Sequence, residues 1–298
     1  MCVTATADVD RAVAVAHLPG VILGTFGDMV RVPGSLGSLQ TAKADGADVR
    51  ILYSALDALQ LAHRNPQRHV VFLGIGFETT APSIASVLLR ARAESVHNLT
   101  VLCLHKLTPP ATRAILDAGD VPLSGIIGPG HVTTIIGSDA WAFLPRDYGI
   151  PCAIAGFEPL DVLRAIASLV DMVERGEPAV SNAYPRGVSA KGNLVARDLM
   201  DTVFQLESVE WRGLGTLPNS GLALRPEFRD WDATSRFDVP RGASQEPIGC
   251  RCGDVLRGTI EPLECPLFGR ACSPESPVGA CMVSGEGACA AHLQYGGL

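Results

Sequence analysis

The residues best suited to carry chemistry are cysteines near the carboxyl end of the chain. Six of the nine cysteines lie between residues 250 and 289, whereas the other three are scattered over the preceding sequence. Such clustering indicates one local site. In a reducing compartment, a late group of cysteines is more often a metal site than a set of disulfides.

Four of these cysteines have spacing and neighbours that suit an iron–sulfur cluster. The pattern Cys-x12-Cys-x6-Cys-x16-Cys is formed by Cys252, Cys265, Cys272 and Cys289. Each stands beside glycine, proline or another small residue, so backbone amides can approach the sulfur atoms. These four contain no Cys-x2-4-Cys knuckle, which is the usual signature of zinc. The pattern favours [4Fe–4S] over zinc, with unligated thiols as a third alternative, and leaves Cys250 and Cys281 as spares.

Polar side chains also stand where predicted strands end. They follow short glycine-containing runs and are Asp28, Glu78, His131 and Glu158. Because ligands of an open parallel sheet bind beyond the carboxyl ends of its strands, we expect a cleft with Asp28, Glu78 and His131 on its rim. The alternative, strongest for Asp28 and Glu158, is that each acid caps the helix that follows.

The elements that position these residues alternate along the chain. Near-continuous apolar runs begin at residues 21, 49, 69, 99, 125 and 151, and helix-compatible stretches cover 54–63, 80–95, 110–118, 138–144 and 159–174. Buried parallel strands have such uninterrupted runs, and their alternation with helices is the βαβ signature. We predict an α/β fold with two Rossmann-like parallel-sheet units, followed by a loop-rich C-terminal iron–sulfur domain.

The predicted domain boundaries follow these changes in character. Residues 1–63 are assigned to the remainder of an N-terminal α/β domain, 64–176 to a second α/β domain, and 177–298 to the domain with the cysteines. Within the last, we predict a helix over 193–206 and a hairpin over 211–224 that turns at Pro-Asn-Ser-Gly. The stretch from Arg241 has few long apolar side chains, so apolar burial alone cannot stabilise it and it needs cross-links of some kind.

Composition excludes several classes of protein. With 47% hydrophobic and 18% charged residues, and no apolar run near the roughly 20 residues of a bilayer span, we expect a soluble globular protein and no membrane partner. A net charge of −7 and the lack of a basic run argue against nucleic acid. The opening residues lack the features of an export signal, so we expect a cytoplasmic protein.

Seven ordered motifs resemble the HypD family of hydrogenase maturation factors. They are TFGDMVRVPG (25–34), GIGFETTAP (74–82), GPGHV (128–132), AGFEPLD (155–161), EWRGLG (210–215), ECPLFG (264–269) and SGEGACAA (284–291). Their number, length and order make the resemblance specific along the chain.

The resemblance implies a scaffold on which the iron centre of [NiFe]-hydrogenase is built. Family members are expected to bind a small HypC-type chaperone, receive cyanide through HypE and HypF, and hold an Fe(CN)2(CO) unit before it reaches the hydrogenase large subunit. A C-terminal [4Fe–4S] cluster is expected to relay electrons to a cysteine site between two α/β domains. The family's cluster ligands match Cys252, Cys265, Cys272 and Cys289, whereas Asp28, Glu78 and His131 match motifs near the cleft.

The N-terminus departs from the family pattern. Family members carry an upstream Cys-Gly-Gly-His motif and then Gly-Pro-Gly-Cys-Pro-Val-Cys, whose last cysteine matches Cys2. The cysteine expected to bind iron and the thiol partner of Cys2 are therefore not in this sequence. We expect that the start codon has been placed too far downstream, and mass spectrometry of the natural protein's first residues tests this.

Two other functions are compatible with the same residues. One is a cluster-dependent disulfide reductase resembling ferredoxin-thioredoxin reductase, which would turn over dithiol substrates. The other is a binding module stapled by structural zinc. Cyanide bands in the infrared favour the scaffold, turnover of a disulfide favours the reductase, and zinc without iron favours the module.

Overall fold

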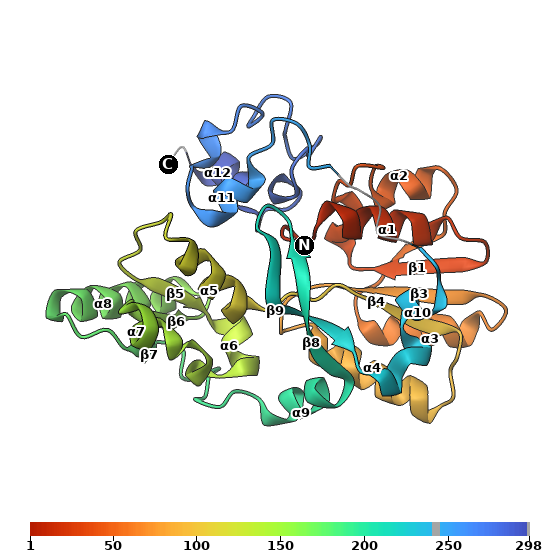
Figure 1. The fold of residues 1–298 in the computed structure, drawn as a ribbon, viewed down its shortest axis with the longest axis horizontal. Coiled ribbons are helices and arrows are strands. Elements are labelled where there is room, and N and C mark those ends of the chain that lie inside the picture. The colour runs from red at the N-terminus through yellow and green to blue at the C-terminus, as the bar shows by residue number, and fades with distance from the viewer. Residues whose placement is uncertain (240–244, 297–298) are drawn as a thin grey trace. The chain divides into compact units, whose positions relative to one another are not determined.

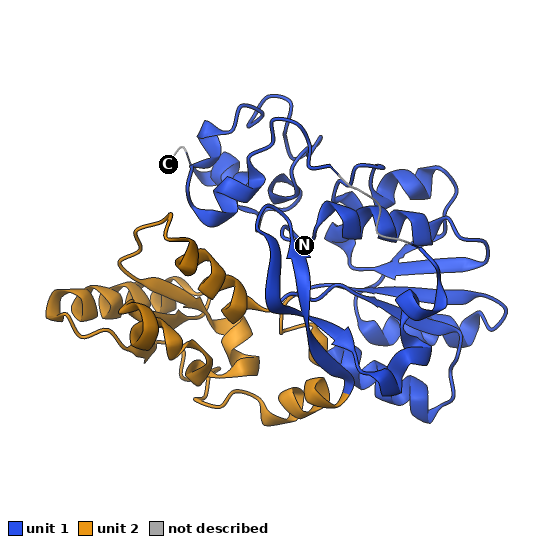
Figure 2. Cartoon of the chain, in the orientation of Figure 1, with its two compact units in different colours: residues 1–76, 83–106, 203–298 blue, residues 77–82, 107–202 orange. Residues whose placement is uncertain are grey.

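The computed structural model describes residues 1–239 and 245–296, and its elements form the predicted α/β fold (Figure 1). The chain divides into two compact units (Figure 2). Residues 1–76, 83–106 and 203–298 form the first unit, and residues 77–82 and 107–202 form the second.

The first unit is built on a four-stranded parallel sheet in the order β2-β1-β3-β4. Its strands are β1 (Val21–Thr25), β2 (Val49–Ile51), β3 (His69–Gly74) and β4 (Leu99–Cys103). In the register, Leu23 of β1 lies opposite Val49 on one side and Val71 on the other. Nearly every residue of β1, β3 and β4 is buried, which explains their uninterrupted apolar sequences.

Helices α1 (Thr6–Ala16), α2 (Leu39–Ala44), α3 (Ala55–Arg64) and α4 (Ala81–Ala93) belong to this part of the chain. The sequence clearly marks the start of α3, because Ser54 Oγ accepts from the Asp57 amide at 3.2 Å and Asp57 Oδ2 accepts from the Ser54 amide at 2.9 Å. This capping box satisfies two free donors of the first turn. Helix α1 was not predicted from the apolar runs, and its Val9 and Val13 pack into the core of the sheet.

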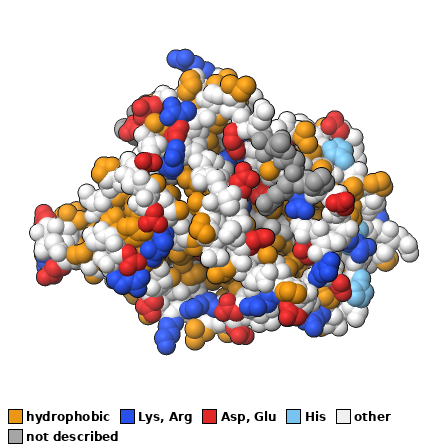
Figure 3. Space-filling view, viewed as in Figure 1, with side chains coloured by type: hydrophobic (Ala, Val, Ile, Leu, Met, Phe, Trp, Pro, Cys, Tyr) orange, Lys and Arg blue, Asp and Glu red, His pale blue; other side chains and the backbone are white. Residues whose placement is uncertain are grey.

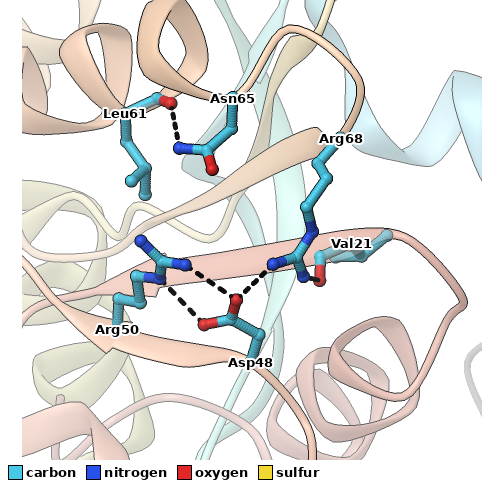
Figure 4. A network of polar contacts seen from close by, with 6 residues as sticks. All are labelled: Val21, Asp48, Arg50, Leu61, Asn65 and Arg68. Carbon is cyan, nitrogen blue, oxygen red and sulfur yellow. Dashed lines mark hydrogen bonds and ion pairs between the residues drawn. The ribbon is translucent and has the colours of Figure 1, made fainter.

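A polar network ties the amino ends of the strands together (Figure 4). Asp48 accepts from Arg50 Nε at 2.8 Å and from Arg68 Nη1 at 2.6 Å, and Arg68 Nη2 donates to the Val21 carbonyl at 2.8 Å. Both arginines thus hold the carboxylate that precedes β2. The hydrogen bond from Arg50, together with that from Arg68, lowers the pKa of Asp48 to about 2.

The second unit has a three-stranded parallel sheet in the order β5-β6-β7. Its strands are β5 (Ile126–Pro129), β6 (Cys152–Ala155) and β7 (Val180–Asn182). The other elements are α5 (Thr108–Ala118), α6 (Gly130–Ile136), η2 (Ser138–Trp141), α7 (Phe143–Tyr148), α8 (Pro159–Arg175) and most of α9 (Leu194–Val203). Trp141, Leu144 and Ile154 are buried together at its core.

An antiparallel hairpin, β8 (Phe204–Trp211) and β9 (Gly215–Leu224), belongs to the first unit. The predicted turn at residues 218–221 is wrong, because the chain reverses between Trp211 and Gly215 with Gly213 at φ +73°. The Pro-Asn-Ser-Gly segment lies inside β9, opposite a register shift between Glu207 and Val209. Its turn-forming residues thus produce a strand irregularity, with Asn219 at φ +50°.

Short elements make up the rest of the first unit. They are η1 (Gly27–Arg31) after β1, then η3 (Pro226–Trp231), α10 (Ala233–Arg236), α11 (Cys252–Arg257), η4 (Pro262–Glu264), η5 (Ala280–Met282) and α12 (Ala288–Tyr295). Arg241, where the loop-like stretch was predicted to begin, lies outside the described residues. The described remainder consists mostly of loops with small helices.

The compact units correct the predicted boundaries at 63/64 and 176/177. Strands β3 and β4 complete the sheet of β1 and β2, so the first unit extends to Gly76 and includes residues 83–106. The second unit extends to Thr202, and the hairpin and cysteine region return to the first. Apolar runs identify strands but carry no local signal for which strands pair, and the predicted boundaries failed for that reason.

Two further observations concern the surface. Among the described residues, no helix combines the length and the apolar character that crossing a bilayer requires. Acidic and basic side chains are interspersed over the visible face of the molecule (Figure 3).

Candidate metal centre and strand-end residues

The structure gathers the late cysteines in one buried place in the first unit. Cys252, Cys272, Cys281 and Cys289 pack in a single core cluster, and the side chain of Cys250 lies against it. Cys265 is also buried, and its charge acts on Cys250 together with those of Cys252 and Cys272. We call these six residues the thiol cluster. It contains the four predicted ligands and also the two cysteines predicted to be spares.

Small helices and turns bring these six residues together. Cys252 is the first residue of α11, Cys281 lies in η5, and Cys289 is the second residue of α12. Cys265 follows η4 directly, and a bridge between Phe268 and Cys272 closes the next loop. The local backbone therefore brings these six cysteines of the C-terminal region into one part of the unit.

The backbone approaches two of the thiols at Val278 and Gly279. The Val278 amide donates to Cys272 Sγ at 3.3 Å. A Cβ at Gly279 would lie 2.8 Å from Cys250 Sγ, so glycine leaves room for that sulfur.

Some thiols of the thiol cluster contact one another directly. Cys281 Sγ donates to Cys289 Sγ at 3.1 Å. A hydrogen bond with Cys281, together with burial, raises the pKa of Cys252. Burial raises the pKa of Cys250 to about 11. These shifts favour the protonated thiols of Cys250 and Cys252, and a metal bound to either sulfur would have to displace its proton.

A mononuclear metal site requires several side chains that converge on one ion. Within the part of the chain that the structure describes, no three His, Cys, Asp or Glu side chains are arranged to hold one metal ion. A cubane binds its four thiolates through four different iron atoms, so its ligands do not converge on one point. A single tetrahedral zinc would need such a convergent set of ligands.

Cys2 lies in the same unit as the thiol cluster and is half-buried. Burial raises the pKa of its thiol, and the nearby charge of Cys252 adds to the rise. The structure thus brings Cys2 close to one predicted cluster ligand. The other two cysteines lie elsewhere, Cys103 at the end of β4 and Cys152 in β6.

Glu78 is placed in the second unit, where it is 2% exposed. Its Oε1 accepts from the Thr108 amide at 2.8 Å and from Thr108 Oγ1 at 3.1 Å. Burial raises the pKa of Glu78 to about 7, although these hydrogen bonds oppose the rise. Glu78 can therefore hold or release a proton near neutral pH, as general acid–base groups do.

His131 and Phe157 lie together at the carboxyl ends of β5 and β6 in the second unit. Their ring centroids are 5.0 Å apart, and Phe157 is 82% exposed. Arg186 holds the first turn of α8, because it donates to both carboxylate oxygens of Asp161 at 2.7 and 2.6 Å. Its contact with Glu158 at 3.0 Å shows that this acid forms an ion pair, and it makes no side-chain cap on α8.

Asp28 lies on η1 of the first unit and does not cap that helix through its side chain. It lines a pocket of about 600 Å³ with Arg31, Ser284, Glu286 and other residues of the C-terminal region. The three expected rim residues thus divide between the units: Asp28 belongs to the first, and Glu78 and His131 belong to the second.

Sequence reasoning missed several residues that hold these sites. Thr108 is 30 positions from Glu78, and Arg212 reaches back to Thr4. Contacts over such separations leave no periodic pattern in the chain.

Known proteins resemble this chain along nearly its whole length. The family model HypD, described as the hydrogenase formation hypA family, matches residues 1–296. The hydrogenase maturation factor HypD of Azotobacter vinelandii is 50% identical over 303 residues, which cover 99% of this chain and 80% of the relative. Those of Cupriavidus necator and Escherichia coli are 48% and 45% identical, cover 99% of this chain, and are themselves covered to 80% and 79%. The chain therefore belongs to the HypD family of hydrogenase maturation factors.

Proposed function

We propose that this protein is a scaffold for assembly of the Fe(CN)2(CO) centre of [NiFe]-hydrogenase. It would work with a HypC-type chaperone and with HypE and HypF, and its product would reach the hydrogenase large subunit indirectly. The observation that carries the proposal is the buried thiol cluster beside Cys2, in a chain of the HypD family. The proposed site of action is the cytoplasm.

The thiol cluster would hold a [4Fe–4S] cluster through Cys252, Cys265, Cys272 and Cys289. When bound, that cofactor supplies single electrons. The thiol cluster fits it because its sulfurs are buried, the Val278 amide donates to Cys272 Sγ, and Gly279 leaves space at Cys250. Since a hydrogen bond with Cys281 and burial raise the pKa of Cys252, binding of the cofactor there would release a proton.

The ligand set itself can be tested because Cys250 and Cys252 flank a single residue. The charges of Cys252, Cys265 and Cys272 all act on Cys250, whereas Cys252 hydrogen-bonds with Cys281. Cys252→Ser should remove bound iron if the proposed set is right, and Cys250→Ser should leave it. The reverse result would assign Cys250 as the ligand in place of Cys252.

The iron fragment is the cargo of this reaction. Soft thiolates suit iron of this kind, so Cys2 is proposed to take part in holding or reducing it. Glu78 would hold or move a proton because its pKa lies near neutrality. His131 would orient a ligand of the iron from its place beside Phe157. Asp28 would act at the pocket on η1.

Maturation in cells tests this proposal. The full-length gene, with any residues that precede Met1, would be expressed in a host whose own factor has been deleted. Glu78→Gln and His131→Ala should abolish hydrogenase activity, whereas the exposed control Glu174→Gln should not. Full maturation by both site variants would reduce Glu78 and His131 to structural residues.

A second candidate, a disulfide reductase, is favoured by the close thiols. Cys281 Sγ and Cys289 Sγ are 3.1 Å apart, and Cys252 hydrogen-bonds with Cys281, so a dithiol could pass electrons to a substrate disulfide. Repeated turnover of a disulfide substrate by the reconstituted protein would support this candidate. Infrared cyanide bands on the protein purified with its partners would support the scaffold.

A further inference from the structure

Arg212 occupies an unusual position for a cation, in the turn between β8 and β9. It is 1% exposed, and burial of an arginine is costly unless its donors are satisfied. Its Nη1 has no hydrogen-bond partner among the described residues and makes only a long ion pair, at 3.9 Å, with Glu246 Oε2. Such a buried cation needs an explanation in the structure around it.

The bonds of Arg212 run to the segment that follows Cys2. Its backbone amide donates to the Val3 carbonyl at 2.9 Å. Its Nε donates to the Thr4 carbonyl at 2.9 Å, and its Nη2 donates to the Pro33 carbonyl at 2.7 Å. Arg212 therefore fixes the two residues after Cys2 by hydrogen bonds and ties them to the loop after η1.

The same turn touches the first residues of α11. A Cβ at Gly213 would lie 2.2 Å from Gly253 Cα, and a Cβ at Gly253 would lie 2.6 Å from Gly213 Cα. Only glycine fits at both positions, and Gly253 directly follows Cys252. The turn thus lies between the segment of Cys2 and the helix that begins at Cys252.

From these contacts we propose that Arg212 is a positioning residue that holds Cys2 beside Cys252, with Gly213 and Gly253 setting the distance between the turn and α11. The inference deepens the proposed function, because it names what keeps a thiol for the iron fragment next to the electron-supplying thiol cluster. Arg212 itself touches neither cofactor nor cargo in this account.

Cross-linking of the reduced, metal-free chain tests the inference without requiring the cofactor. Dibromobimane joins thiols that lie close together, and mass spectrometry of the peptides identifies each link. The parent chain should give a Cys2–Cys252 link and a Cys281–Cys289 link. The second link is an internal standard, because those sulfurs are 3.1 Å apart within the thiol cluster.

Arg212→Gln should lower the yield of the Cys2–Cys252 link about tenfold, because a released segment lowers the effective concentration of one thiol near the other. The Cys281–Cys289 link should persist. Arg212→Lys keeps the charge but not the forked donors, so it should restore the link only in part. The exposed control Arg229→Ala should match the parent.

Gly213→Ala decides the case in which Arg212→Gln fails to fold. This variant keeps the guanidinium and pushes the turn away from α11, so it should also reduce the Cys2–Cys252 link selectively. An undiminished Cys2–Cys252 link in either folded variant would overturn the inference. Failure of the parent chain to bind iron would contradict the proposed function and leave the cross-linking result intact, so the two failures are distinguishable.

Discussion

The parallel sheet and the thiol cluster of the first unit are stabilised in different ways. Strands β1, β3 and β4 bury continuous runs of large apolar side chains, such as those of Leu23, Val71 and Phe72. The core around the thiol cluster contains four buried cysteines together with Val255, Met282 and Ala290, and partly buried side chains such as Leu267 and Phe268 pack against it. Burial of apolar area can support the sheet by itself. We propose that the cysteine region depends in addition on what its sulfurs bind.

The largest expected effect is loss of the cofactor from the cysteine region alone. Cys272→Ser should abolish bound iron after anaerobic reconstitution, since the variant removes one proposed ligand. Hydrogen exchange should rise throughout residues 249–296 while β1, β3 and β4 stay protected. Cys103→Ser is the matched control, because Cys103 is half-buried in the same unit but lies outside the thiol cluster. Equal amounts of bound iron in the two variants would contradict the proposed difference between the thiol cluster and the rest of the unit.

The stability of the parallel sheet should depend on side-chain packing and not on bound iron. Phe72 is 1% exposed and packs edge-to-face on Phe26 with centroids 5.5 Å apart. Phe72→Ala should lower the free energy of unfolding by about 3–5 kcal/mol, with or without iron. Tyr53→Ala, at a side chain that is 92% exposed, should change it by less than about 0.5 kcal/mol. Urea unfolding measures both, and a small loss for Phe72→Ala would show that packing does not dominate there.

A smaller effect is expected at Glu78, whose folded pKa of about 7 exceeds its ordinary value of 4.5. The stabilisation from the protonated carboxyl is complete below pH 4.5 and is lost as pH rises through 7. Glu78→Gln keeps an acceptor for Thr108 without a charge, so it should stabilise the protein by about 2 kcal/mol at pH 8. Urea unfolding at pH 8 and pH 5 should show the gain shrinking at the lower pH. A gain of equal size at both values would contradict a raised pKa.

The smallest effect is expected at the surface network of Asp48 (Figure 4). Its folded pKa of about 2 lies below the ordinary value of 3.8, so its stabilisation is present above pH 3.8 and is lost as pH falls through 2. Because both arginines are partly exposed, Asp48→Asn should cost only about 1 kcal/mol at neutral pH. The cost, measured by urea unfolding, should vanish near pH 2. Asp230→Asn, at an exposed carboxylate, should cost nothing at either pH.

The sequence predicts the parts of the fold that leave local signals. Apolar runs located β1, β3, β4, β5 and β6 within a few residues, and Ser54 located the start of α3. The pairing of β3 with β1 left no such signal, so the predicted boundary near residue 63 was wrong. The hairpin turn was misplaced because Pro-Asn-Ser-Gly favours a turn locally, whereas Gly213 makes it in the folded chain.

The candidate site shows the same limit. The cysteines could be grouped from sequence because they are close together along the chain, and the structure packs them together. The partner of Glu78 and the bonds of Arg212 could not be predicted, since they join residues 30 and 208 positions apart. The sequence therefore predicts which residues could carry chemistry. It does not predict the long-range contacts that orient their side chains.

Anaerobic reconstitution of the intact chain with iron and sulfide tests the central claim most directly. Quantification of iron, sulfide and zinc should give about four irons and four sulfides per chain and no zinc, as a [4Fe–4S] cluster requires. A colourless protein that takes up zinc in place of iron would contradict the account.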